Sequence, residues 1–469
     1  MPTFSDALRR LGDRTPGAAI DAEIIAAAAL LGTVLVLGLA TAADYALTVD
    51  EFNTDDYGPK ALAWYTSGFK DRSHFETVEF SLWYYGPWFQ MLTAYVQSFD
   101  VADRVIVRHV LTFLVGLAGV AALLPIGRLA VGRWAGLTAI VLCLLTGYFY
   151  GSLFFTPIDV PFAAAMTWAT LAVLVMTRQL VPSWWATVVA GLMTGLAIAT
   201  RTGGIITHAY LLAGLLLWAV EFFAAHGRLT VHYLLRLGAR YTAAVFIAWM
   251  TAFALWPWLQ LGNPFRQFKV ALTHFATIPM TYEFSHWGER IWTSELPATY
   301  IPGQLTARLP EAFLLLLVVA CIYALSAGVA LAGSGWRSAM LTTARRRAIL
   351  VVGAAVILPI GFLIMQRATL YDGLRHVLFI IPMLAILAGF GFWALLPLLR
   401  RVPVVAAVAV GAYAGGLVVT LAALHPLEYV AMNALAGGTR GAYGNFELDY
   451  LSAAATEGLR VIRHAILTP

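Results

Sequence analysis

The sequence predicts an all-α protein that crosses a membrane about eleven times and carries further helices in the membrane interface. Composition, apolar runs and charge distribution support this prediction. Of the 469 residues, 60% are apolar and only 12% are charged, whereas soluble globular chains average about 45–50% and about 25%. This composition excludes an ordinary water-soluble enzyme, a fibrous protein and a disordered chain. Cys143 and Cys321 lie in apolar runs and predict neither a disulfide framework nor a cysteine metal site.

Eleven runs are long enough for a helix that spans the hydrocarbon core, which takes about 20 apolar residues. They cover roughly 24–43, 105–126, 134–151, 160–177, 184–200, 204–223, 241–258, 311–332, 349–366, 376–396 and 403–424. The first run exceeds the apolar stretch of a signal peptide, about 7–15 residues, so we expect an uncleaved anchor. The pairs Gly191/Gly195 and Gly411/Gly415 have the spacing that lets two helices approach closely.

The charged residues between these runs predict the orientation of the chain. If the N-terminus is cytoplasmic, the cytoplasmic segments hold 15 basic and 5 acidic residues, and the other side holds 15 basic and 20 acidic residues. Excess Lys and Arg marks the cytoplasmic side, most clearly at Arg345–Arg347 and Arg400–Arg401. We expect a multi-pass protein of the plasma membrane (the inner membrane of a bacterium) with an extracytoplasmic C-terminus. The basic balance then reflects topology, and no nucleic-acid partner is expected.

The polar residues concentrate on the predicted outer side, in segments 44–103, 259–310 and 425–469. Loops of this length are usually structured or functional. The cytoplasmic connections are too short for a βαβ unit of about 30 residues, which excludes ATP hydrolysis and the use of a nucleotide-sugar through a Rossmann-like domain. We expect residues 1–424 to form a membrane-embedded catalytic domain. The tail 425–469 is interpreted as a small capping element or as a surface helix.

The first outer segment is unusually acidic and aromatic. It holds ten acidic residues, three basic residues and fifteen aromatic residues among 60 positions. Aromatic residues at helical spacing, including Tyr57 and Trp64, predict helices in the interface plane, where Trp and Tyr are favoured. One interpretation is an aromatic belt with solvated carboxylates, and the other is a cleft beside the lipid with carboxylates at its mouth. The position of Asp50 and Glu51 directly after the first run favours the cleft.

Further polar residues stand at the outer ends of the runs. Arg108 opens the second run, Asp159 opens the fourth, Arg201 joins the fifth and sixth, and Arg375 and His376 lie between the ninth and tenth. Any one of them is most simply an interfacial ion pair. Several cations on one membrane face are suited to a lipid phosphate, because guanidinium groups match phosphate geometry.

A metal ion is left open by the sequence. Carboxylate oxygens suit hard divalent cations, but the pair His286/Glu289 is too little to define a site. We assign no metal ligand.

Several blocks, in order along the chain, resemble membrane glycosyltransferases of the GT-C superfamily. The nearest group is the bacterial relatives of the dolichyl-phosphate-mannose protein mannosyltransferases, in glycosyltransferase family 39. The blocks are Asp50–Glu51 with segments 64–68 and 84–87, then 154–162, 371–376, 425–429 and 446–450.

This resemblance implies transfer of a hexose or pentose from a polyprenyl-phosphate donor outside the cytoplasm, with inversion at the anomeric carbon. It implies that Asp50 is the catalytic base. We expect Glu51 to orient Asp50 or the acceptor, and Asp159 to face the same cavity. The expected phosphate contacts are Arg201, Arg375, His376 and Arg108, and the expected cleft residues are Tyr85, Trp88, Tyr371 and Asp372. The partners are then the lipid-linked donor, membrane lipids and an acceptor that the sequence does not identify.

Two other interpretations remain open at this point. A transporter or lipid flippase would explain the apolar runs but not the crowded first outer segment. The runs hold almost no charge away from their ends, whereas ion-coupled carriers usually place ionisable groups inside the membrane, and inspection finds no internal repeat. A membrane scaffold with a degenerate site is the third interpretation.

Overall fold

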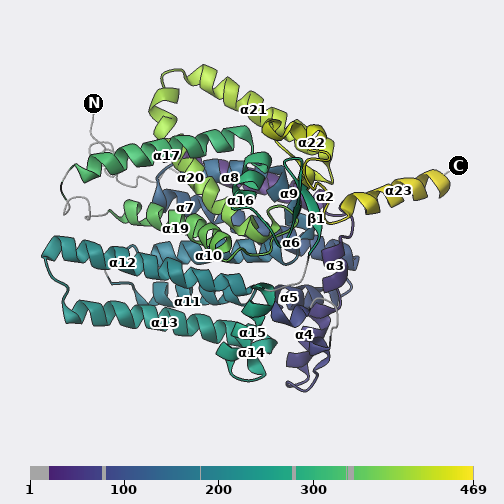
Figure 1. The fold of residues 1–469 in the computed structure, drawn as a ribbon, viewed down its shortest axis with the longest axis horizontal. Helices are drawn as coiled ribbons and strands as arrows, with labels where there is room; N and C mark the ends of the chain where they lie inside the picture. Colours follow the sequence, from purple (N-terminus) through teal and green to yellow (C-terminus); the bar gives the residue numbers. More distant parts are fainter. Residues whose placement is uncertain are drawn as a thin grey trace.

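The computed structural model describes residues 21–76, 81–179, 181–276, 281–333, 335 and 343–467. Within these ranges the chain is mainly helical (Figure 1). One antiparallel hairpin, β1 (Glu283–His286) and β2 (Glu289–Trp292), is present in the described part, with Phe284 opposite Ile291. Its turn places Trp287 and Gly288 at positive φ, 54° and 81°, which is the backbone of tight hairpin turns.

Nine helices of the described chain are long and apolar enough to cross a membrane, which confirms the prediction of a multi-pass membrane protein. They are α2 (Ala22–Thr41), α6 with α7 (Arg104–Ala121 and Leu123–Ala130), α10 (Asp159–Met176), α12 (Thr207–His226), α13 (Val231–Leu255), α17 (Glu311–Ala332), α19 (Ala344–Met365), α20 (Ile381–Leu399) and α21 (Pro403–Leu424). The bent pair α8 (Ala135–Leu145) and α9 (Gly147–Phe155), which meets at 72°, makes a tenth if it counts as one span.

The predicted number of eleven spans is not confirmed. The run 184–200 forms α11 (Trp184–Ile198), an apolar helix of only 15 residues. At 1.5 Å per residue such a helix is about 22 Å long, whereas a bilayer core is about 30 Å thick. Composition shows that this run is apolar, but the length of the helix is decided by the turn that follows it.

Small residues allow neighbouring helices of the bundle to pack closely. The central helix α10 is buried on nearly every face, and α11 packs against α13. A Cβ on Gly191 or Gly195 of α11 would lie 2.8 Å from the Ala244 carbonyl oxygen or 2.5 Å from the Ala248 carbonyl oxygen of α13. The close approach that the spacing of this pair predicts is therefore present. Among the residues that the structure describes, none lies within 4 Å of such a Cβ on Gly411 or Gly415 of α21, so the second pair forms no helix contact there.

The three long polar segments gather at one end of the helix bundle (Figure 1). The first contributes α3 (Val49–Thr54), α4 (Tyr57–Thr66) and α5 (Trp88–Gln97), and the second contributes α14 (Pro257–Gln260), α15 (Pro264–Ala276), the hairpin and α16 (Tyr300–Arg308). The tail contributes η5 (Glu428–Val430), η6 (Ala434–Ala436), α22 (Gly438–Gly441) and α23 (Ala453–Leu467).

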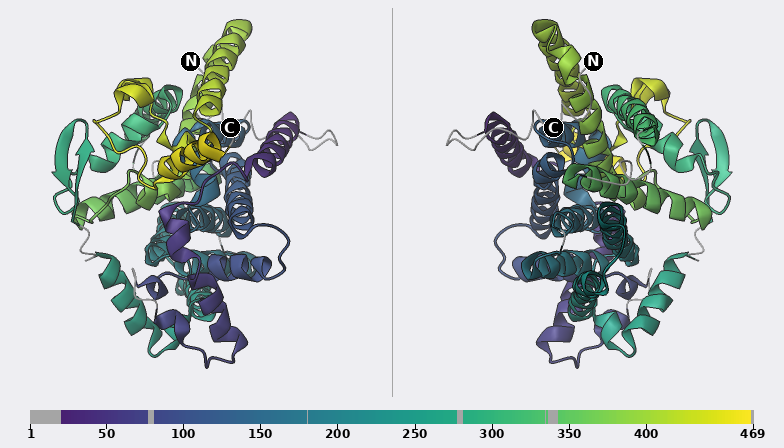
Figure 2. Two further views of the ribbon diagram at one scale, coloured as in Figure 1. Left: turned by 90° about the vertical axis from the view of Figure 1, so that its right-hand side faces the viewer. Right: turned by 90° about the vertical axis from the view of Figure 1, so that its left-hand side faces the viewer.

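Contacts between these segments make them one unit. The Val49 amide donates to the Leu451 carbonyl at 3.4 Å, and Trp64 Nε1 donates to Gln260 Oε1 at 2.8 Å. An isolated bridge joins His286 of the hairpin to Phe446 of the tail. Seen from this end in the left panel of Figure 2, the hairpin lies at the periphery.

Candidate functional site

Asp50 lies in the first turn of α3, and a capping box fixes that turn. The Glu51 amide donates to Thr48 Oγ1 at 3.4 Å, and the Thr48 amide donates to Glu51 Oε2 at 3.1 Å. The fully buried Glu51 side chain also lies 3.0 Å from His109 Nε2. Glu51 therefore does not line a cavity with Asp50. Its predicted role in orienting Asp50 would be exerted through the backbone of this turn, since a capping box satisfies two otherwise unpaired amides.

Arg375 connects Asp50 to two further carboxylates. Its guanidinium pairs with Asp50, with Asp372 at 2.9 Å from Nη1, and with Asp159 at 3.3 Å from Nε. Arg201 pairs with the other oxygen of Asp159. The five residues come from α3, the N-terminus of α10, the connection after α11 and the loop before α20. The structure thus assembles Asp50, Asp159, Arg201 and Arg375, all of which the sequence singled out, into one charge cluster.

The cluster borders a polar cavity of about 660 Å³, which we call the acidic cavity. Its wall includes Asp50, Tyr85, His274, Tyr282, Tyr371, Asp372, Arg375, Glu447, Asp449 and Tyr450. The four carboxylates in this wall come from three separate parts of the chain. Tyr282 OH donates to Asp372 Oδ1 at 3.0 Å, which links the second outer segment to the cluster.

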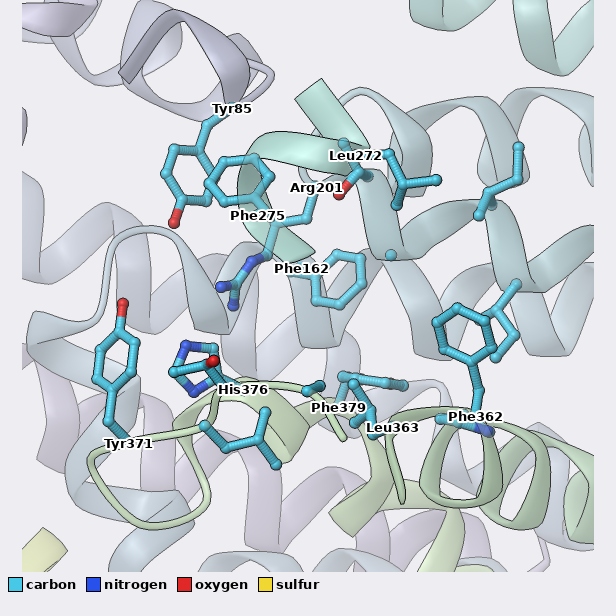
Figure 3. A pocket seen from close by; sticks show the side chains of 18 residues that line it. Tyr85, Phe162, Arg201, Leu272, Phe275, Phe362, Leu363, Tyr371, His376 and Phe379 are labelled. Atoms are coloured by element: carbon cyan, nitrogen blue, oxygen red, sulfur yellow. The ribbon is translucent and has the colours of Figure 1, made fainter. Parts of the chain in front are cut away.

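A second cavity, which we call the apolar cavity, has a volume of about 260 Å³. The apolar side chains of its wall include Phe162, Ile205, Leu272, Phe275, Phe362, Leu363 and Phe379, and its basic side chains are those of Arg201 and His376. Figure 3 shows the Arg201 guanidinium close to the His376 ring, on the side where Tyr85 and Tyr371 lie. Tyr85, Phe275 and Tyr371 line both cavities, so the two spaces adjoin at these side chains.

Burial shifts the titration of the carboxyls in the acidic cavity. It raises the pKa of Asp50 and Asp372, and nearby Asp159 adds to the rise while Arg375 opposes it. The pKa of Glu447 is raised to about 7 by burial and by the charge of Asp372, against a smaller opposing effect of Arg308. A carboxyl whose pKa lies nearer to neutrality is a better general base at neutral pH than an ordinary one.

Four predicted site residues are not part of the wall of either cavity: Glu51, Trp88, Arg108 and Asp159. Asp159 is buried behind the cavity wall and reaches the site through its ion pairs with Arg201 and Arg375. Arg108 pairs with Asp55 and donates from Nη1 to the Glu51 carbonyl at 2.8 Å. Trp88 donates from Nε1 to Thr200 Oγ1 at 2.7 Å. These contacts give no support to a phosphate contact by Arg108 or to a place for Trp88 in the cleft, and both roles stay predictions. Both side chains join outer elements: Arg108 bonds to the backbone of α3, and Trp88 bonds to the hydroxyl of Thr200 after α11.

The tail supplies site residues that the sequence predictions did not name. Glu447, Asp449, Tyr450 and Leu451 close one side of the acidic cavity. Asp449 accepts hydrogen bonds from the Ala453 and Ala454 amides at 3.0 Å and so caps the first turn of α23. The signal in the sequence was the alternation of acidic and aromatic residues at 446–450. The tail is thus a wall of the site up to Leu451, and α23 then extends away from the bundle (Figure 1).

The described residues contain no group of three or more His, Cys, Asp or Glu side chains placed to hold a metal ion. At the place where Asp50, Asp159 and Asp372 converge, the guanidinium of Arg375 supplies the positive charge. His286 lies 3.2 Å from Gln304 Nε2 through its Nδ1, and Glu289 follows it on the exposed strand β2. We therefore assign no ligands for a divalent cation among the described residues.

No protein-family model matches the chain, and no curated protein matches it. Among solved structures, it is similar to ArnT from Cupriavidus metallidurans bound to undecaprenyl phosphate, with 15% identity, a TM-score of 0.44 and coverage of 77% of this chain and 59% of that chain.

It is also similar to the Archaeoglobus fulgidus oligosaccharyltransferase in the apo form, with 13% identity, a TM-score of 0.49 and coverage of 91% and 56%. For the same enzyme tethered to an acceptor peptide, the values are 14%, 0.46, 89% and 55%. Both neighbours are GT-C membrane glycosyltransferases. The chain spans less than two thirds of the length of each of these proteins.

Proposed function

We propose that this protein is an inverting glycosyltransferase that moves a hexose or pentose from a polyprenyl-phosphate donor to an acceptor hydroxyl at the extracytoplasmic face of the plasma membrane. One observation supports this proposal most: Asp50 lies in a polar cavity that adjoins an apolar cavity bearing Arg201 and His376. The bundle thus offers, at one end, a place for an apolar chain, a guanidinium for its phosphate and a carboxylate for the acceptor.

The donor fits the apolar cavity by its chemistry. Phe362 and Leu272 are partly exposed at its wall, so a polyprenyl chain would leave the bundle among membrane lipids. Its phosphate would meet Arg201, whose guanidinium matches phosphate geometry. The described residues that line this cavity include no Asp or Glu, so nothing in this wall repels an anionic headgroup.

In the proposed reaction the acceptor hydroxyl attacks the anomeric carbon. A new bond forms between this carbon and the acceptor oxygen, and the bond from the carbon to the phosphate oxygen breaks. The Asp50 carboxylate takes the proton of the hydroxyl, and the phosphate leaves with the bonding electron pair. A single displacement from the opposite face inverts the configuration.

One carboxylate base is sufficient for this chemistry, because a phosphate leaves without protonation. Glycoside hydrolysis differs, since its leaving group needs a second carboxyl as acid. Arg375 would hold Asp50 in place by its ion pair and would set positive charge beside the reacting centre, where preorganised charge stabilises the transition state most effectively. Asp159 would fix Arg201 and Arg375 relative to each other.

The transporter and flippase interpretation finds less support. Both cavities lie at the same end of the bundle, whereas a flippase must offer its lipid a path to the other end. The acidic cavity is also closed by the tail on one side, which suits a reaction chamber better than a passage.

Asp50→Asn tests the proposal. With purified protein in vesicles that contain a labelled polyprenyl-phosphate sugar, we expect donor consumption to fall about 10²–10⁴-fold, the usual contribution of a general base. Asp56→Asn is the matched control, because Asp56 is exposed in the same segment and pairs with Lys60 at 2.7 Å. Full turnover in Asp50→Asn would remove Asp50 from the mechanism, and a thermal unfolding curve of each variant checks that the fold is retained.

A further inference from the structure

We infer that the acceptor is a small polyhydroxy compound that is neutral or carries an amine, and that bears no phosphate or carboxylate. This inference rests on the proposed function, because it assigns the acceptor to the acidic cavity. The two adjoining cavities differ sharply in charge, and this difference separates the anionic donor from the acceptor.

The wall of the acidic cavity carries four carboxylates, those of Asp50, Asp372, Glu447 and Asp449. Asp372 and Asp449 already accept hydrogen bonds from tyrosines, Tyr282 and Tyr429 respectively. Glu447 is different, because its buried Oε2 has no hydrogen-bond partner within the described part of the chain. A hydroxyl or ammonium group of a ligand would satisfy this oxygen, whereas a second anion would leave it unpaired.

The positive charge available to an anionic acceptor is small. Arg375 is the guanidinium in this wall, and its three nitrogens already contact Asp50, Asp159 and Asp372. His274 also lines the cavity, and burial lowers the pKa of its imidazole, which favours the neutral form. Arg201 and His376 line the apolar cavity instead. A phosphate or carboxylate on the acceptor would therefore meet mostly like charge.

The aromatic side chains indicate what does fit. Tyr85, Tyr282, Tyr371 and Tyr450 line the same cavity. Tyrosine rings offer flat apolar faces and hydroxyls that orient a ligand, and they attract an ammonium group through their electron-rich faces. The volume of about 660 Å³ lies in the range of small-molecule sites, about 300–1,000 Å³. The reacting part of the acceptor is therefore small.

A matched set of methyl hexosides tests the inference. The set holds one neutral hexoside and its amino, uronate and 6-phosphate analogues, each added to vesicles with the labelled donor. Two readouts are followed: sugar transfer to the analogue, and competition with slow transfer of the sugar to water. For both readouts, we expect the neutral and amino members to reach half of their maximal effect at concentrations at least tenfold lower than the two anionic members.

Equal or better action of the uronate or phosphate member would overturn the inference, and so would inactivity of all four members. A failure of the proposed function gives a different result, because no Asp50-dependent donor consumption would then occur even without an acceptor. Glu447→Gln adds a second readout: discrimination against the anionic members should fall at least threefold. The control is Glu289→Gln, an exposed position on β2, which should leave the discrimination unchanged.

Discussion

At the scale of single residues, the site depends on ion pairs between residues that lie far apart in the sequence. Arg375 and Asp50 are 325 positions apart, and Arg375 and Asp159 are 216 apart. The charge pattern showed that each residue stood at an outer end of an apolar run. It did not show that one guanidinium serves three carboxylates, because that depends on which helix faces turn toward one another. Breaking such a partly buried network typically costs about 3–5 kcal/mol.

Glu447 gives a pH-dependent prediction at this scale. Its pKa is about 7 in the folded chain, against a usual 4.5, because of burial and the nearby Asp372. The folded protein therefore holds a proton that the unfolded chain releases, and the free energy of unfolding falls as the pH rises from about 4.5 to about 7. Glu447→Gln should thus stabilise the protein by about 1–2 kcal/mol at pH 8, after allowance for partial exposure, and much less at pH 5.

Thermal unfolding in detergent at pH 5 and pH 8 measures this effect. Glu289→Gln on the exposed strand β2 is the control and should change stability equally at both values. If Glu447→Gln gives the same shift at pH 5 and pH 8, the carboxyl does not titrate in this range.

At the scale of elements, the short helix α3 has a large effect on the site, because it carries Asp50. It has six residues, and its hold on Asp50 comes from the capping box of Thr48 and Glu51. The sequence shows the pattern Thr48-Val49-Asp50-Glu51, which is the signature of a capping box. The sequence predicts this local turn better than it predicts the distant ion-pair partner of Asp50, because a cap involves residues only three positions apart.

Thr48→Val tests the role of this cap. Loss of an N-cap costs about 1 kcal/mol, and because Asp50 lies in the capped turn, we expect kcat to fall at least tenfold while the KM for the donor changes little. Thr230→Val is the matched control: Thr230 caps α13 through the Tyr233 amide, away from the residues that line the two cavities. Thr48→Val should lose more stability than Thr230→Val, because the buried Thr48 hydroxyl also donates to Glu51 Oε2 and to the Phe155 carbonyl, so kcat is compared per folded protein at a temperature where both variants are folded. An equal kcat in the two variants would show that the cap does not position Asp50.

The length of α11, the bend between α8 and α9, and the hairpin are features that the sequence did not predict. Each of the eleven apolar runs coincides with a helix or a bent helix pair, because hydropathy is a property of local sequence. The 15-residue length of α11 and the 72° bend between α8 and α9 follow from backbone turns, which a hydropathy average does not detect. The hairpin at Glu283–Trp292 is short and lies in a polar segment, so its turn, Trp287-Gly288, is its main signal.

At the scale of the whole molecule, the described charges divide between the two ends of the bundle. At the end opposite the cavities, Arg128 and Arg133 pair with Asp21, and Arg347 pairs with Glu221. The excess of arginine at this end is the basis for expecting it to face the cytoplasm.

Labelling of single cysteines tests the orientation. In a background where Cys143 and Cys321 are replaced by Ser, we expect Glu289→Cys to react with a membrane-impermeant maleimide in intact cells. Arg401→Cys, at the opposite end, should react only after the membrane is permeabilised. The reverse pattern would place the cavities in the cytoplasm and would exclude a donor presented on the outer leaflet.

The sequence by itself determined the membrane class, the positions of the apolar helices and the charge asymmetry, and it singled out Asp50, Asp159, Arg201 and Arg375, because hydropathy, charge and local spacing are carried by short stretches of chain. Tertiary structure alone decided that Arg108 pairs with Asp55, that Glu447 of the tail lines the same cavity as Asp50, and that the carboxylates line one cavity while Arg201 lines the other. These features depend on the direction in which each side chain points after the helices have packed, and this direction is set by contacts between residues hundreds of positions apart.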